Sequence, residues 1–198
     1  MEHYNNVKAL IQSKKLTEAV QYCEDELKKY PSTDFHWILN RDLLHLKEEL
    51  FRFIDINFGD KPQLLEAKAF YSELNGFSIN WDKWFFDVSA YDTLEDYQDE
   101  SSDWLGQGFW GSTDPEYLVV SGWERLQEVF KDFQKNKRYK DKQMSAVSEL
   151  AQFLVVLRLQ ELFDKTISHG KQLGLKWANL PWGVTAHGYY LVYEINNN

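Results

Sequence analysis

Cysteine, proline and glycine are all scarce in this chain of 198 residues, and each shortage limits what the protein can be. The single cysteine, Cys23, cannot form a disulfide within the chain, which indicates a reducing compartment such as the cytoplasm. Four prolines and ten glycines leave little room for flexible linkers, so we expect a single domain over residues 1–198. The longest strongly apolar run covers residues 153–157 only, whereas a membrane span needs about 20 residues. With no charged-then-apolar leader at the N-terminus, the sequence predicts a soluble cytoplasmic protein.

Positive charge is the other shortage. The chain has 22 Lys and Arg residues against 31 Asp and Glu residues, which gives a net charge of −9. A surface of this sign repels a nucleic-acid backbone and attracts a basic partner, so direct binding to DNA or RNA is disfavoured. Six basic residues gather over residues 131–142, and we interpret them as a solvated loop between two helices rather than a phosphate-binding patch.

The spacing of apolar residues predicts an α+β fold. Its expected order is N-terminal helices, a small antiparallel β-sheet, two further helices of which one is central and buried, and a C-terminal β-hairpin. The helical part is expected over residues 1–75 and the mixed part over residues 76–198.

Four helices are expected in the helical part. Two short ones precede Pro31 and form a hairpin. A third carries apolar residues at spacings of three and four over residues 35–54. A fourth restarts after the break at residues 59–62 and ends at Asn75-Gly76.

The mixed part combines strand and helix signals. Strand composition marks residues 77–79, 84–88 and 118–120, and a closing hairpin over residues 184–195. A capping box over residues 121–124 starts one helix, in which Ser121 is expected to accept from the Glu124 amide. The next helix runs from residue 145 to about 167, and its apolar centre predicts that neighbours cover it on every side.

Residues 3–31 resemble a single tetratricopeptide-like helical hairpin. The second helix begins with Glu18-Ala19-Val20 and is followed by Pro31, which match that family's Glu-Ala-aliphatic start and closing proline. Such units need about three stacked copies to bury their faces, and no second copy follows here. The resemblance therefore implies one helical hairpin, with a peptide-binding scaffold as an alternative function.

The segment between Lys83 and Arg125 contains no basic residue over 41 positions, yet it carries ten carboxylates and ten aromatic rings. Poor periodicity between Tyr91 and Gly111 predicts a long loop that faces solvent. In one interpretation the carboxylates steer a cationic partner and the rings anchor it. In the other, the loop is solvated and its rings pack back into the core. The partner-binding residues of the first interpretation are Asp87, Tyr91, Asp92, Glu95, Asp96, Tyr97, Asp99, Glu100, Asp103, Trp104 and Trp110.

No catalytic, metal-binding or cofactor-binding motif is present. The acidic residues lack the alternating pattern of a calcium loop, and the glycines over residues 106–111 lack the lysine of a phosphate-binding loop. We therefore predict a non-enzymatic protein without a cofactor. The alternative is a small hydrolase-like enzyme in which His187 acts as a general base beside Asp87 or Asp103.

Four stretches resemble a family of bacterial immunity proteins that neutralise contact-dependent toxins. They are Trp84-Phe85-Phe86-Asp87, Tyr91-Asp92, Asp103-Trp104 and Leu154-Val155-Val156-Leu157. This resemblance implies a cytoplasmic inhibitor that binds a basic toxin, such as a nuclease, and blocks its active site. The net charge of the chain independently fits a basic protein as the partner.

Overall fold

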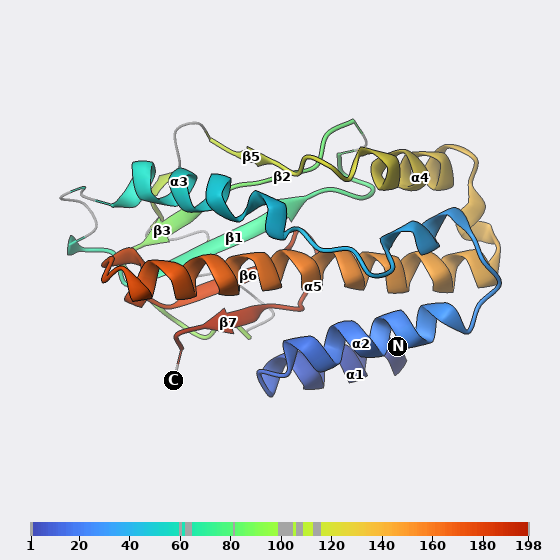
Figure 1. Cartoon of the computed structure of the whole chain (residues 1–198), viewed down its shortest axis with the longest axis horizontal. Coiled ribbons are helices and arrows are strands. Elements are labelled where there is room, and N and C mark those ends of the chain that lie inside the picture. Colours follow the sequence, from blue (N-terminus) through green and yellow to red (C-terminus); the bar gives the residue numbers. More distant parts are fainter. Residues whose placement is uncertain are drawn as a thin grey trace.

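The computed structural model of this chain describes residues 2–59, 61, 65–80, 82–98, 105, 109–112 and 116–197, with the main chain alone over 109–112. Over these residues the fold is α+β, which confirms the predicted class. Five α-helices lie beside a mixed sheet of seven strands in the described part of the chain. Figure 1 shows α5 running along the long axis, between α3 and the hairpin of α1 and α2, with the sheet behind it.

The helices are α1 (Glu2–Gln12), α2 (Leu16–Lys28), α3 (Lys47–Phe58), α4 (Glu124–Lys135) and α5 (Lys142–Gln172). Short 3-10 helices are η1 (Asp34–Ile38), η2 (Leu44–Leu46), η5 (Arg138–Lys140) and η6 (Trp177–Asn179). The strands are β1 (Ala69–Asn75), β2 (Phe85–Phe86), β3 (Ser89–Tyr91), β4 (Phe109–Ser112), β5 (Leu118–Val119), β6 (Trp182–Ala186) and β7 (Tyr193–Ile195).

Strand β1 is the centre of the sheet. It pairs antiparallel with β2 and β3 on one side and parallel with β6 on the other. On the outside of the sheet, β5 pairs with β2, β4 pairs with β3, and β7 pairs with β6, all antiparallel. Strands β2 and β3 follow one another along β1 in the same register, since Leu74 pairs with Phe86 and Tyr71 pairs with Ser89. Glu73 therefore lies opposite Asp87. The parallel pairing corrects the expected antiparallel sheet, and it arises because α5 carries the chain back across the sheet before β6 begins.

Three predicted elements are wrong. Residues 69–75 form β1 instead of a helix, so the helical part ends at Phe58 rather than at residue 75. The predicted helix over 35–54 is broken into η1, η2 and the start of α3, because Asn40 adopts a left-handed conformation with φ of 58°. Residues 77–79 form a turn, in which Phe77 has φ of 57°, and the hairpin therefore joins β1 to β2.

The predicted strand over residues 84–88 shortens to β2, and the other predicted helices and strands are confirmed, with one change at a cap. The hairpin of α1 and α2, the strand β5, the helix α4 and the closing hairpin of β6 and β7 all form. Helix α4 begins at Glu124, and its carboxylate accepts from the Gly122 amide at 2.9 Å instead of completing a box with Ser121. Residues 153–157 of α5 are all buried, as predicted for a central helix.

The main core lies between α5 and the sheet. Phe163 of α5 contacts the ring of Trp182, which in turn stacks on Phe70 of β1 at 4.3 Å between ring centroids. Side chains alternate along a strand, so the neighbours Ala69, Tyr71 and Glu73 point to the sheet face opposite α5, which we call the outer face. No helix in the part of the chain described here combines the length and the apolar character that crossing a membrane requires.

Candidate functional site

Tyr97 fixes the loop that follows β3 against the outer face. Its hydroxyl donates to the Phe70 carbonyl at 2.9 Å, and its ring stacks nearly parallel to that of Tyr71. The ring lies so close to Gly183 that a Cβ atom there would come within 2.6 Å of it. Burial raises the pKa of the Tyr97 hydroxyl well above its usual range, so the hydroxyl stays protonated and donates. The loop over residues 92–98 is therefore held in one place by a ring buried in the sheet.

Gln98 ties the same loop to the other end of the chain. Its side-chain amide donates to the Val192 carbonyl at 3.1 Å and to the Glu194 carboxylate at 2.7 Å. Gln12, at the end of α1, donates to the Gln98 side chain at 3.2 Å. Strand β7 and helix α1 thus support a loop that the sequence predicts as an isolated, solvent-facing segment.

The acidic side chains of this loop remain on the surface. Glu95 and Asp96 are exposed, and Asp92 and Asp87 are partly buried. The outer face adds two acids, Glu73 from β1 and Glu194 from β7, that the sequence reasoning missed. We call these six residues the acidic face: Glu73, Asp87, Asp92, Glu95, Asp96 and Glu194. Its members come from three distant parts of the sequence.

Two of the predicted aromatic anchors are buried within the protein instead of exposed to a partner. Tyr91 and Tyr97 are 5% and 3% exposed, and they pack with Tyr71 and Val192 in a small cluster on the outer face. The prediction that these two rings insert into a partner is therefore wrong, and their packing is what the solvated-loop interpretation predicts. Each ring removes more apolar surface from water by packing onto the sheet than it would in a free loop.

Five predicted partner-binding residues have no described side chain. Asp99, Glu100, Asp103 and Trp104 lie outside the described residues. Trp110 belongs to β4, where the main chain alone is described. Because β4 pairs with β3, the predicted loop between Tyr91 and Gly111 already contains a strand.

A hydrogen-bonded group of titratable residues lies at the edge of the acidic face. The Tyr71 hydroxyl donates to one carboxylate oxygen of Glu73 at 2.9 Å, and Nδ1 of His187 lies 3.1 Å from the other. The carboxylate that contacts His187 is therefore Glu73, whereas the sequence pointed to Asp87 or Asp103. Burial, with the charge of Glu73 as a smaller cause, raises the pKa of Asp87.

The basic cluster lies at the far end of α5. Figure 1 shows α4 beside the N-terminal end of α5, whereas β1, β3 and β6 lie along its C-terminal half. Lys131 pairs with Asp82 and with Glu128 at 3.2 Å each, and Arg138 pairs with Asp132 at 2.7 Å. These contacts neutralise part of the cluster. The cluster also lies away from the sheet, so it does not border the acidic face.

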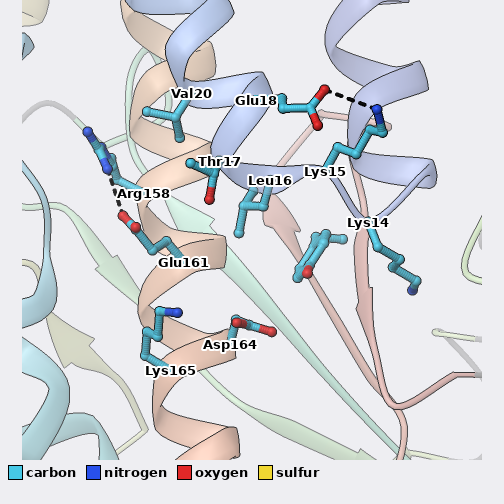
Figure 2. Close-up of a pocket in the computed structure, with 11 residues that line it drawn as sticks. Lys14, Lys15, Leu16, Thr17, Glu18, Val20, Arg158, Glu161, Asp164 and Lys165 are labelled. Carbon is cyan, nitrogen blue, oxygen red and sulfur yellow. Dashed lines mark hydrogen bonds and ion pairs between the residues drawn. The ribbon is translucent and has the colours of Figure 1, made fainter.

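A cavity of about 350 Å³ lies between the start of α2, the middle of α5 and β7 (Figure 2). Its lining carries seven charged side chains and only a few apolar ones. The lining residues are Lys14, Lys15, Leu16, Thr17, Glu18, Val20, Arg158, Glu161, Asp164, Lys165 and Tyr193. This hollow is separate from the acidic face, and none of its lining residues was singled out from the sequence as a candidate.

Comparisons of the chain with protein-family models, with curated proteins and with solved structures found no match. Within the described ranges, no group of three or more His, Cys, Asp or Glu side chains is placed to hold a metal ion. The protein is therefore an α+β protein with an acidic face on the outer side of its sheet, in which Tyr97 and Gln98 hold the loop over residues 92–98 in place.

Proposed function

We propose that the protein binds a basic protein through its acidic face and thereby inhibits it, as an immunity protein does. The observation that carries this proposal is the attachment of loop 92–98 by Tyr97, which keeps Glu95 and Asp96 exposed on a fixed backbone. A recognition loop that is already ordered loses little conformational entropy when it binds.

Electrostatic steering supplies the mechanism. The acidic face gathers six carboxylates, with Lys14 at its β7 edge, and the net charge of the chain is −9, so the field attracts a cationic protein from a distance. Carboxylates at Glu95 and Asp96 then pair with Lys and Arg side chains at the contact. In a nuclease, those cations are the groups that hold substrate phosphates, so an acidic surface that occupies them blocks the substrate.

The partner and its compartment follow from the sequence. The immunity-type resemblance favours a basic toxin as the partner, and the single cysteine favours the cytoplasm as the place of binding. A non-enzymatic role fits the absence of a catalytic motif in the sequence.

The peptide-binding scaffold is the weaker alternative. The apolar side of α2, including Ala19, Cys23 and Leu27, is completely buried in the main core. Glu24 of α2 also pairs with Arg158 of α5 at 3.1 Å. The helical hairpin is therefore occupied by α5 on the side that would otherwise grip a peptide.

A hydrolase is the second alternative, and one contact favours it. Glu73 accepts from Nδ1 of His187, which would leave Nε2 of the imidazole free to act as a base in solvent. Tyr71 fixes the same carboxylate. The His187 side chain is 57% exposed, so water reaches it freely.

Charge reversal on the acidic face tests the proposal. The double variant Glu95→Lys, Asp96→Lys should capture less of the basic partner from a lysate of the native organism, with mass spectrometry to identify it. With the purified partner, stopped-flow association at low salt should slow by about tenfold or more, and the rate should depend less on salt.

The matched control is Glu48→Lys, Glu49→Lys on α3, which changes the net charge equally at two exposed positions away from the acidic face. Its association rate should stay closer to that of the natural protein. Equal slowing by both double variants would reduce the acidic face to a contributor of net charge, and the proposed interface would be wrong.

A further inference from the structure

The polar side chains that line the cavity beside α2 fall into two sets, one paired within the protein and one unpaired. Figure 2 shows the paired set. Lys15 contacts Glu18 at 3.1 Å, and Arg158 contacts Glu161 at 2.8 Å. Lys14 points away from the cavity and donates to the Glu194 carbonyl at 2.6 Å. Lys15, Glu18 and Glu161 are therefore paired within the protein, as are the terminal nitrogens of Arg158, whereas the buried Nε atom of Arg158 has no partner among the described residues.

The second set is unpaired. The side chains of Thr17, Asp164 and Lys165 and the hydroxyl of Tyr193 form no hydrogen bond or ion pair with any other described residue. Together they supply an ammonium, a carboxyl and two hydroxyls around one hollow. Thr17 and Lys165 are exposed and Asp164 is partly buried, so these groups are hydrated in the open cavity and free to contact a ligand that enters it.

Asp164 is the most informative member of this set. Burial raises the pKa of its carboxyl, and the nearby Lys165, Lys171 and Lys14 offset that only in part. A carboxyl that is partly desolvated without a fixed cation destabilises the folded state. A bound ammonium group at this position would restore the missing partner.

We propose that this cavity binds a small zwitterion of amino-acid size, with the ligand's ammonium at Asp164 and its carboxylate at Lys165 and Thr17. The volume of about 350 Å³ lies within the range of small-molecule sites. Leu16, Val20 and the ring of Tyr193 offer apolar contacts for the side chain of the ligand. The site is distinct from the acidic face, so this inference stands whether or not the protein is an inhibitor.

Thermal unfolding of the full chain with single amino acids tests the proposal. Each of the standard amino acids is added separately at millimolar concentration, with propionate and ethylamine as probes that carry one charged group each. At least one amino acid should raise the melting temperature, because a ligand that binds only the folded state stabilises it. Neither single-charge probe should do so at the same concentration.

Two variants locate the site. Calorimetric titration with the best amino acid should show affinity falling by about tenfold or more in Lys165→Met and in Asp164→Asn, because each loses one charged hydrogen bond. Lys142→Met, at an exposed position at the start of α5, is the matched control and should bind as the natural protein does. Far-UV circular dichroism checks that each variant is folded.

Three results would overturn the proposal. They are the absence of any shift with every amino acid, an equal shift with propionate or ethylamine, and an equal loss of affinity in Lys142→Met. None of them bears on the capture experiment with the acidic face, so the two proposals fail independently.

Discussion

Asp87 and Glu73 face each other from neighbouring strands on the outer face. Like charges directly opposite on paired strands destabilise a sheet. Tyr71 and His187 both contact Glu73, so its carboxylate has two partners, whereas burial raises the pKa of Asp87. The folded state therefore holds the Asp87 proton to a higher pH than the unfolded chain does, and the charged form of Asp87 opposes folding.

Asp87→Asn should consequently stabilise the protein at neutral pH. The gain in the free energy of unfolding should shrink as pH falls and vanish below the ordinary carboxyl pKa of 3.8, where Asp87 is protonated in both states. Urea unfolding across a pH series measures it. Glu95→Gln, at an exposed position, is the control and should give a nearly flat difference. A variant less stable than the natural protein at neutral pH would show that hydrogen bonds to the Asp87 carboxylate outweigh its burial.

For single residues, the sequence predicted which side chains matter better than it predicted which way those side chains point. It singled out Asp87 and Tyr97 because a long stretch without Lys or Arg is visible in the sequence. It gave no sign that the Tyr97 ring faces inward, because that depends on Gly183, far along the chain, leaving room for the ring. Glu73 was missed because its segment was assigned to a helix.

Among the elements, helix α5 holds the closing hairpin through one buried amide. The side chain of Gln160 is completely buried and donates to the carbonyls of Val184 at 3.0 Å and Leu191 at 2.6 Å. These carbonyls lie on β6 and on the connection to β7. Gln160 thereby fixes the end of the chain to the central helix.

Gln160→Leu should lower the free energy of unfolding by about 1–3 kcal/mol, because two buried carbonyls lose their donor while the volume is kept. Urea unfolding monitored by circular dichroism measures the change. Gln21→Leu on the exposed side of α2 is the control, with an expected effect within about 0.5 kcal/mol. Equal costs for the two variants would mean that packing, not the buried amide, fixes the hairpin.

The elements that the sequence predicted best are those with a plain helical pattern of apolar residues. Helices α2 and α4 bury one side, and α5 is apolar around its centre, so their patterns are plain. Strand β1 failed because residues on both of its faces are buried, which removes the alternation of a half-exposed strand. The break at Asn40 was invisible because the Glu24 carboxylate that accepts from its amide lies on another helix.

Across the whole molecule, one continuous core joins the helices to the sheet. It includes Val7 of α1 at one end of the sequence and Ile195 of β7 at the other. Three tryptophans, Trp84, Trp177 and Trp182, are fully buried in it. A core that spans both predicted parts favours unfolding as a single cooperative unit.

Unfolding in urea should therefore give one transition. The curves from far-UV circular dichroism, which follows the helices, and from tryptophan fluorescence, which follows the core, should superimpose. A helical signal that falls at lower urea than the fluorescence would show that the α1–α2 hairpin unfolds separately, and the prediction of a single domain would be wrong.

For the whole molecule, composition predicts the net charge but not where the charged side chains gather. The value of −9 comes directly from the sequence, whereas the acidic face needs β1, β7 and loop 92–98 to meet on one side of the sheet. Only the pairing of distant strands brings these carboxylates together.

The contact from Lys14 to β7 has a further consequence. Within the described part of the sheet, β7 pairs with β6 alone, so its other edge carries free main-chain groups. Such an edge can recruit a strand from another molecule and start aggregation. Lys14, held in a left-handed turn with φ of 59°, donates to the outward carbonyl of Glu194 and places a hydrated charge there. The N-terminal hairpin thus shields this edge of the sheet from intermolecular strand addition.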